Sequence, residues 1–224
     1  MRMTIIGRKK HRTFTAVTVV FLAAMLIIAL SAAMVSKRES GGLQTAKRSE
    51  EAGVYAVICV GFAQGEVYEL EKELFEGFGI RATFFVTSRG LETDAQKAKE
   101  MISFGNALGV YCENADGMSR YELLRLLALE NDAFYEFCGR RPRFCLTDGS
   151  YPSYAAEAAY IYGQKAVSYS VKILTGDEII KNGDVVLCAA ESKDALYAFA
   201  RAVSRAASNG LMPVTLAALY DKNG

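Results

Sequence analysis

Residues 54–86 read VYAVICVGFAQGEVYELEKELFEGFGIRATFFV, and this stretch decides the fold class. It begins with an unbroken apolar run at residues 54–60 and ends with a second run at residues 82–86. Short continuous apolar runs are typical of strands that are buried on both faces. Residues 67–78, between the two runs, have a helical period. The apolar face expected for this helix contains Leu70, Leu74 and Phe78. The stretch therefore predicts a strand–helix–strand unit with parallel strands.

The same alternation continues to the end of the chain. Five further strands are expected, at residues 108–112, 143–146, 166–171, 185–188 and 212–216. Helical patterns lie beside or between them, at residues 95–102, 120–138, 153–163 and 194–208. Seven strands in one α/β domain at residues 53–220 fit an irregular seven-stranded (β/α) barrel better than the eightfold barrel. In such a fold the loops that follow the strands are expected to form the functional site.

The region before this domain divides into three parts by charge. Residues 1–12 carry five basic side chains and no acidic one, residues 13–35 carry no charge, and residues 36–52 are polar with charges of both signs. Twenty-three helical residues extend about 35 Å, which is enough to cross a hydrocarbon core of about 30 Å. A basic flank favours a cytoplasmic N-terminus. We therefore expect a cytoplasmic tail, a transmembrane signal anchor at residues 13–35, a linker, and an extracytoplasmic domain in a single-pass protein of the cell membrane.

A cleaved signal peptide is the alternative interpretation of this apolar segment. Ser31, Ala32 and Ala33 resemble a small-residue cleavage site. A signal peptide usually has an apolar core of about 7–15 residues, and this segment is longer. Its length favours a retained anchor, and either interpretation exports the rest of the chain.

Histidine content and charge exclude several classes of function. The only histidine is His11, which lies in the basic tail, so the predicted domain has no imidazole for metal binding or proton transfer. Five of the 26 basic residues also lie in that tail, which leaves 21 basic residues against 25 acidic ones in the rest of the chain. A mildly acidic domain is not expected to bind nucleic acid.

The chain has five cysteines, at positions 59, 112, 138, 145 and 188. Buried cysteine is ordinarily a small apolar core residue. An exported chain can also oxidise a pair, although an odd number leaves one thiol over, and four thiolates can hold zinc. No C-x-x-C spacing is present, and a catalytic cysteine would have no histidine base. Core packing, a disulfide and a metal site thus stay open.

Seven short motifs follow one another in a recognisable order. They are GIRATFFV at 79–86, FAQG at 62–65, GNALG at 105–109, GRRPRF at 139–144, YSV at 169–171, GDVVL at 183–187 and VTL at 214–216. The first is close to the motif G-(V/I)-x-A-T-F-F-V, the second stands where F-D-D-G is usual, and the third matches G-H-E-(I/L)-G. In their order and spacing along the chain they resemble the polysaccharide deacetylases of carbohydrate esterase family 4, the NodB homology domain.

The resemblance implies a set of functional positions, and each is substituted in this chain. Family members bind a divalent metal through one aspartate and two histidines, with a second aspartate as base and a late histidine as acid. The metal-binding positions correspond to Gln64, Tyr111 and Ala115. The catalytic positions, including the arginine that orients the base and a later aspartate, correspond to Ala63, Leu146, Lys172 and Ala189. We therefore expect no cofactor and no metal-activated water at these positions.

Tyrosines are dense in the second half of the domain, and aromatic faces stack on sugar rings. The expected ligand groove contains Tyr111, Asp148, Tyr151, Tyr169 and Lys172. The resemblance implies a catalytically inactive deacetylase-like domain that binds cell-wall glycan or an envelope protein, in the context of peptidoglycan or sporulation. Two alternatives are an active metal-dependent deacetylase with displaced ligands, and a protein-interaction module that regulates an active relative.

Overall fold

The computed structural model describes residues 53–147 and 154–221. The expected tail at 1–12, anchor at 13–35 and linker at 36–52 lie outside these residues, as do the expected groove residues Asp148 and Tyr151. Within the described ranges, no helix combines the length and the apolar character that crossing a membrane requires.

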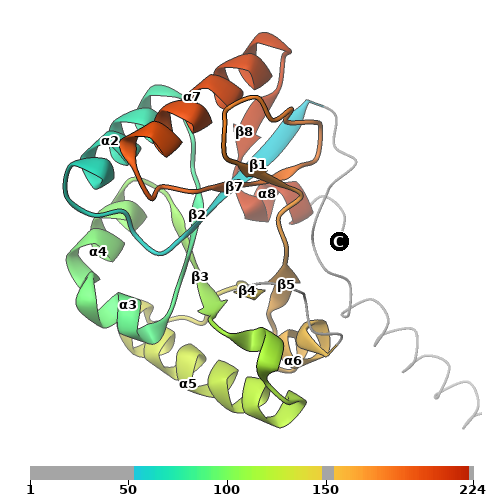
Figure 1. Cartoon of the computed structure of the whole chain (residues 1–224). Helices are drawn as coiled ribbons and strands as arrows, with labels where there is room; N and C mark the ends of the chain where they lie inside the picture. Colours follow the sequence, from blue (N-terminus) through green and yellow to red (C-terminus); the bar gives the residue numbers. More distant parts are fainter. Residues whose placement is uncertain (1–52, 148–153, 222–224) are drawn as a thin grey trace, which may run out of the picture. The chain divides into compact units, whose positions relative to one another are not determined.

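The described strands form one parallel sheet at the centre of the domain (Figure 1). Seven of them follow the order β5-β4-β3-β2-β1-β7-β6, and β8 pairs with β1. The strands are β1 (Val54–Val60), β2 (Thr83–Val86), β3 (Ala107–Cys112), β4 (Phe144–Thr147), β5 (Lys165–Val167), β6 (Val171–Ile173), β7 (Val185–Cys188) and β8 (Met212–Val214). The α/β class and the parallel sheet are confirmed.

The prediction of a single strand at residues 166–171 was wrong. The structure has two short strands there, β5 on β4 and β6 on β7, at opposite ends of the strand order. Residues 168–170 separate the two strands, and Ser170 already lies on the β7 side: its hydroxyl bonds the Asp184 carboxylate at 2.7 Å and accepts from the Val185 N–H at 3.1 Å. The described domain therefore has eight strands instead of seven.

The short link between β5 and β6 also explains the curvature of the sheet. Residues 167 and 171 are four steps apart, which spans at most about 14 Å of extended chain. The two end strands must therefore approach each other, yet no pairing joins them among the described residues. The sheet is a half-barrel that curls without closing.

Strand β1 is the centre of this arrangement because it has three neighbours. Val54 and Ala56 make backbone hydrogen bonds toward the β7 side, to Gly183 and Asp184. The Gly53 carbonyl instead accepts from Met212 at the start of β8. Ile58, Cys59 and Val60 pair with β2. Strands β8 and β2 thus share one edge of β1 in succession, and the other edge pairs with β7.

The described helices are α2 (Gly65–Gly77), α3 (Ser88–Thr93), α4 (Ala95–Ser103), α5 (Arg120–Cys138), α6 (Ala155–Ile161), α7 (Lys193–Ser208) and α8 (Leu216–Asp221), with a 3-10 turn η1 (Ala115–Gly117). Helices α2 to α7 cover the outer face of the sheet, whereas Leu216, Leu219 and Tyr220 of α8 pack in the apolar layer inside the curl. Helix α2 packs against α7, and α5 against α6 (Figure 1). Helices α3 and α8, each of six residues, were not expected because they are too short to show a period.

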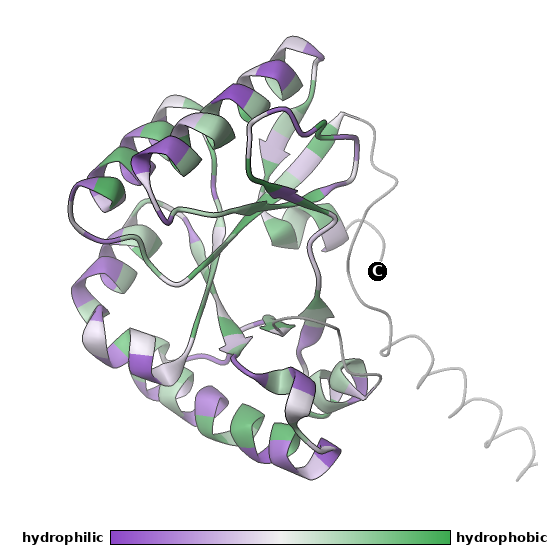
Figure 2. Ribbon diagram, in the orientation of Figure 1, coloured by the Kyte–Doolittle hydropathy of each residue, from purple (hydrophilic) through white to green (hydrophobic). Residues whose placement is uncertain are grey.

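Alternation along the strands separates two apolar layers. On β1, Tyr55, Val57 and Cys59 belong to the layer between sheet and helices, whereas Ala56 and Ile58 belong to the layer inside the curl. Figure 2 shows the strands as largely hydrophobic and the helices as mixed, as expected for a sheet buried on both faces.

Candidate functional site

A cavity of about 750 Å³ opens where β1, β3, β4 and β7 end. Its walls come from the ends of these strands, from the loop after β1, and from α2. Loops that follow parallel strands are the usual place for a site in such folds, so this cavity is the candidate functional groove.

The structure brings together most of the positions expected from the sequence. Six of the seven substituted family positions line the groove: Ala63, Gln64, Tyr111, Leu146, Lys172 and Ala189. The seventh, Ala115, is fully buried at the start of η1 and does not line it. Tyr169 lines the groove as well, whereas Asp148 and Tyr151 lie outside the described residues. Residues up to 126 positions apart, from Ala63 to Ala189, thus face one space.

Both the nitrogen and the oxygen of the Gln64 side-chain amide make hydrogen bonds to residues near the start of α4. Its amide nitrogen donates to the Phe62 carbonyl at 3.2 Å and to an Asp94 oxygen at 3.4 Å. The Lys97 ammonium donates to the Gln64 amide oxygen, to the Ala63 carbonyl at 3.0 Å, and pairs with Asp94 at 2.9 Å. Both polar ends of the Gln64 amide are thus occupied by protein contacts, and neither is available to a divalent cation in this arrangement.

A second set of polar groups in the groove wall was missed by sequence reasoning. Glu71 of α2 is fully buried, and it lies beside Cys59 at the end of β1 and Cys188 at the end of β7. Cys59 and Cys188 are partners in the β1–β7 register. One ligand atom from each of the three residues falls within 4.8 Å of the other two. All three residues line the groove.

The environment of this cluster disfavours charge. Burial raises the pKa of Glu71 to about 7, although the Cys59 thiol and the Lys97 ammonium act in the opposite direction. Burial also raises the pKa of the Cys59 thiol well above its ordinary value, with Cys188 and Glu71 adding to the effect. Among the described residues, neither Glu71 oxygen has a partner that meets hydrogen-bond geometry. The Cys59 thiol lies near the carboxylate but does not make a hydrogen bond of that geometry to it.

The sequence of α2 contained a pattern that could have indicated this cluster. Leu70, Leu74 and Phe78 are only partly buried, and the buried positions of α2 are instead Tyr68, Glu71 and Phe75. These three positions recur at the spacing of one helix face, with the glutamate between two aromatics. A charged residue in the middle of a buried stripe marks an unusual environment, because charged side chains are seldom fully buried.

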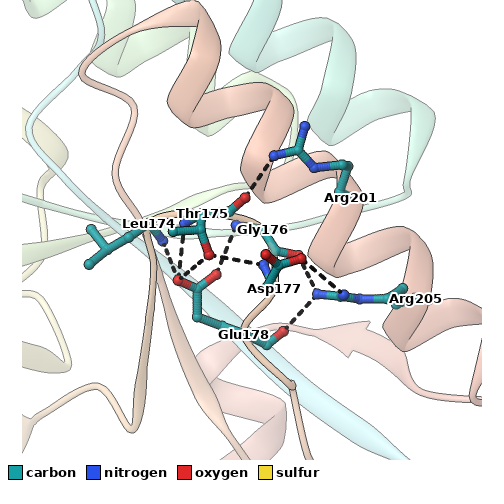
Figure 3. Close-up of polar contacts among 7 residues, drawn as sticks. All are labelled: Leu174, Thr175, Gly176, Asp177, Glu178, Arg201 and Arg205. Atoms are coloured by element: carbon teal, nitrogen blue, oxygen red, sulfur yellow. Dashed lines mark hydrogen bonds and ion pairs between the residues drawn. The ribbon is translucent and has the colours of Figure 1, made fainter.

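The loop after β6, which borders a second hollow beside the groove, is held by a network of polar contacts (Figure 3). The Glu178 carboxylate accepts from the backbone N–H groups of Leu174 and Thr175 at 3.0 Å and of Gly176 at 2.9 Å. Burial raises the pKa of Glu178, but these backbone donors outweigh it and lower the pKa to about 2. The carboxylate is therefore ionised at neutral pH and closes the loop on itself.

Helix α7 holds the same loop from outside. Arg201 donates to the Thr175 carbonyl at 2.7 Å, and Arg205 donates to the carbonyls of Gly176 and Glu178 (Figure 3). Gly176 has a positive φ of 84°, and a Cβ there would lie 2.7 Å from the Ala198 carbonyl oxygen. Only glycine fits this close approach. The second hollow, of about 470 Å³, shares Lys172, Ala189 and Glu191 with the groove.

Four of the five cysteines, at positions 59, 112, 145 and 188, are buried. Cys112 and Cys145 lie in β3 and β4, and Cys138 is partly exposed at the end of α5. Only Cys59 and Cys188 belong to the Glu71 cluster among the described residues.

No protein-family model and no curated protein matches the sequence. Solved structures of similar fold do match. A family 4 carbohydrate esterase from Bacillus anthracis has a TM-score of 0.71 and 16% identity, over 85% of this chain and 93% of its own. A peptidoglycan N-acetylglucosamine deacetylase has a TM-score of 0.70 and 15% identity, over 81% and 94%.

A third similar structure belongs to a pseudoenzyme of the same family. One variant of it has a TM-score of 0.70 and 14% identity, over 80% of this chain and 72% of its own. Another variant, described as having restored enzymatic activity, has a TM-score of 0.64. The chain therefore has the fold of the family 4 carbohydrate esterases, a fold found in both active and inactive proteins. The resemblance inferred from the seven motifs is confirmed at the level of the fold.

Proposed function

We propose that this chain is an envelope protein that binds cell-wall glycan in the groove of a deacetylase-like domain and does not catalyse metal-dependent deacetylation there. The observation that carries the proposal is the lining of the groove. The six family positions that meet in it offer two alanines, a leucine, a glutamine, a tyrosine and a lysine. None of these six supplies a carboxylate or an imidazole.

The missing groups correspond to the two requirements of the reaction. Deacetylation needs a polarised carbonyl and an activated water, and a metal with histidine and carboxylate ligands provides both. Ala63 cannot accept a proton, and Ala189 cannot donate one to the leaving amine. Lys97 places a positive charge against Gln64. The groove is thus equipped for binding and not for this chemistry.

Several features of the groove suit a sugar chain. A volume of about 750 Å³ lies within the range of pockets that enclose small ligands. Tyr169 is 41% exposed at the rim, where its ring can stack on a sugar face. The Lys172 ammonium lies on the same rim and can donate to ring hydroxyls or to a lactyl carboxylate. Peptidoglycan offers both kinds of partner.

We expect Tyr169→Ala to weaken binding of peptidoglycan fragments about tenfold, because a stacked aromatic ring contributes on the order of 1 kcal/mol beyond its area. Binding would be measured by calorimetric titration with soluble fragments. The matched control is Tyr121→Ala on α5, which removes an exposed tyrosine that does not line the groove. It should bind as the parent does.

Other outcomes of this titration discriminate between proposals. Equal losses in both variants, or no binding by the parent, would contradict glycan recognition in the groove. Capture of a specific membrane protein by a parent that ignores peptidoglycan would favour the interaction-module alternative.

The proposal also places the domain outside the membrane, anchored by residues 13–35. We expect protease added to intact, wall-stripped cells to remove a tag fused after Gly224, because the basic tail retains the N-terminus inside. A tag fused before Met1 should be protected and serves as the control. Protection of the C-terminal tag would contradict this topology. Release of soluble protein that begins near Met34 would show a cleaved signal instead.

A further inference from the structure

Cys59, Glu71 and Cys188 form the one candidate metal-ligand group of three or more residues that the described part of the chain contains. Each is buried, each comes from a different element, and none occupies a position that the resemblance assigns to the family's site. We infer that these three residues bind a zinc-type divalent metal ion, with a fourth coordination position open to the groove. This inference goes beyond the proposed function and does not depend on it.

The geometry of the cluster is close to that of a tetrahedral centre. Two sulfur ligands about 2.3 Å from a common zinc lie about 3.8 Å apart at the tetrahedral angle. The three ligand atoms already fall within 4.8 Å of one another, so closing on an ion requires shifts of an ångström or less. Pairing of β1 with β7 places the two cysteines side by side on the same face of the sheet. Helix α2 supplies the carboxylate from above that face.

The donor set indicates the class of metal. Two thiolates with one carboxylate suit zinc and similar borderline-soft ions, whereas calcium and magnesium require oxygen ligands. Three protein ligands with one open position is the usual composition of a zinc site that meets solvent or ligand. All three residues line the groove, so a metal ion would enter the cluster from that side.

The inference also accounts for an unusual feature of the core. Both Glu71 oxygens are buried without a hydrogen-bond partner among the described residues, which is costly for a carboxylate. A metal ion would satisfy one or both oxygens. Two thiolates, a carboxylate and a divalent ion sum to a charge of −1, and Lys97 lies near enough to Glu71 to offset it.

The cluster lies on the opposite side of the sheet from the substituted family positions of β3 and β4. Cys59 and Cys188 belong to the layer between sheet and helices. Tyr111 and Leu146 belong to or pack against the layer inside the curl. The expectation of no cofactor depended on the family positions, and this cluster uses none of them.

Cobalt(II) titration of the full-length chain, purified with reductant and dialysed against chelator, tests the inference. We expect one Co²⁺ per chain, a thiolate-to-cobalt charge-transfer band in the near ultraviolet, intense visible bands of tetrahedral cobalt, and loss of both on addition of Zn²⁺. Cys59→Ser combined with Cys188→Ser should abolish the charge-transfer band. Glu71→Gln should retain that band and bind cobalt at least about tenfold more weakly.

Cys145→Ser is the matched control, because Cys145 is also a buried strand cysteine but lies outside the cluster. It should leave the spectrum unchanged. Alkylation of the unmodified chain in partly denaturing urea gives a second measurement that needs no variant. Because Cys59 and Cys188 are buried, they react only when the chain opens, and Zn²⁺ should slow their reaction but not that of the partly exposed Cys138. Absence of the charge-transfer band, its survival in the double variant, or equal alkylation with and without Zn²⁺ would each overturn the inference.

Discussion

The purified chain should release no acetate above a no-protein control from acetylated chitooligosaccharides or peptidoglycan, whether or not Zn²⁺, Co²⁺ or Ni²⁺ is added. General acid–base catalysis contributes about 10²–10⁴-fold in rate, and a metal adds a further large factor. The groove positions that would supply these groups are Ala63, Gln64, Tyr111 and Ala189. Losing them together should reduce turnover to background, which acetate quantification over long incubations measures.

Acetate release that depends on metal and stops on addition of chelator would contradict the proposed function and favour an active deacetylase with displaced ligands. The Cys59→Ser and Cys188→Ser double variant would then identify the source. Loss of the release in this variant would assign it to the thiol cluster, whereas its persistence would assign it to other groove residues. Metal binding without acetate release would support the metal inference and leave the proposed function intact.

Introducing the aspartate and histidine side chains of the family at five substituted positions should not be sufficient to restore deacetylase activity. The substitutions are Ala63→Asp, Gln64→Asp, Tyr111→His, Ala115→His and Ala189→His. Ala115 is fully buried and does not line the groove, so an imidazole there must displace its neighbours. An aspartate at position 64 would pair with Lys97, which already bonds Gln64 and would compete with the metal. Metal-dependent acetate release by the five-fold variant would contradict this expectation.

Removing the buried carboxylate should have the largest effect on stability. The pKa of Glu71 is raised from its ordinary 4.5 to about 7. The folded chain holds the Glu71 proton more tightly than the unfolded chain does. The loss of stability caused by burying the ionised carboxylate is therefore absent below the pKa of the unfolded state, grows as pH rises, and is complete above the pKa of the folded state. The difference corresponds to about 3 kcal/mol of unfolding free energy. Glu71→Gln should therefore unfold with a higher free energy than the parent at about pH 8, and with a similar one near pH 4.5.

Urea unfolding of the metal-free chain, with chelator and reductant present, measures this difference across pH. The matched control is Glu73→Gln, two residues further along α2, where the carboxylate is exposed. Its unfolding free energy should follow that of the parent at every pH. If the Glu71→Gln and Glu73→Gln curves coincide, the burial of Glu71 does not carry the expected cost.

Much of the fold follows from the sequence because its causes are local. Continuous apolar runs such as residues 54–60 cannot be satisfied outside a sheet that is buried on both faces, and the helical period between them requires a crossover. The prediction of one strand at residues 166–171 was wrong because apolar residues alternate with serines across the break, whereas Ser170 bonds to Asp184 and joins the chain to the β7 side. That contact joins residues 14 positions apart, so no local window contains it.

The candidate groove was partly predictable as well. The order of the seven motifs indicated which residues follow the strands, and six of the seven substituted positions do line one cavity. Ala115 does not line the cavity, because the path of the chain after β3 leads into η1, which places Ala115 in the core. The direction of the Gln64 side chain was not predictable, because it depends on contacts with Lys97 of α4 and with Asp94, the residue just before that helix.

The sequence by itself determined the α/β class, the parallel strands and the absence of imidazole from the predicted domain, because these depend on composition and on periodicity along one segment. Only the tertiary structure decided that Cys59, Glu71 and Cys188 meet. The two cysteines are 129 positions apart and become neighbours through the β1–β7 register. Glu71 becomes buried because α2 turns the stripe of Tyr68, Glu71 and Phe75 toward the sheet. Strand register and helix rotation are set by packing between distant segments, and a single sequence does not contain that packing in any local pattern.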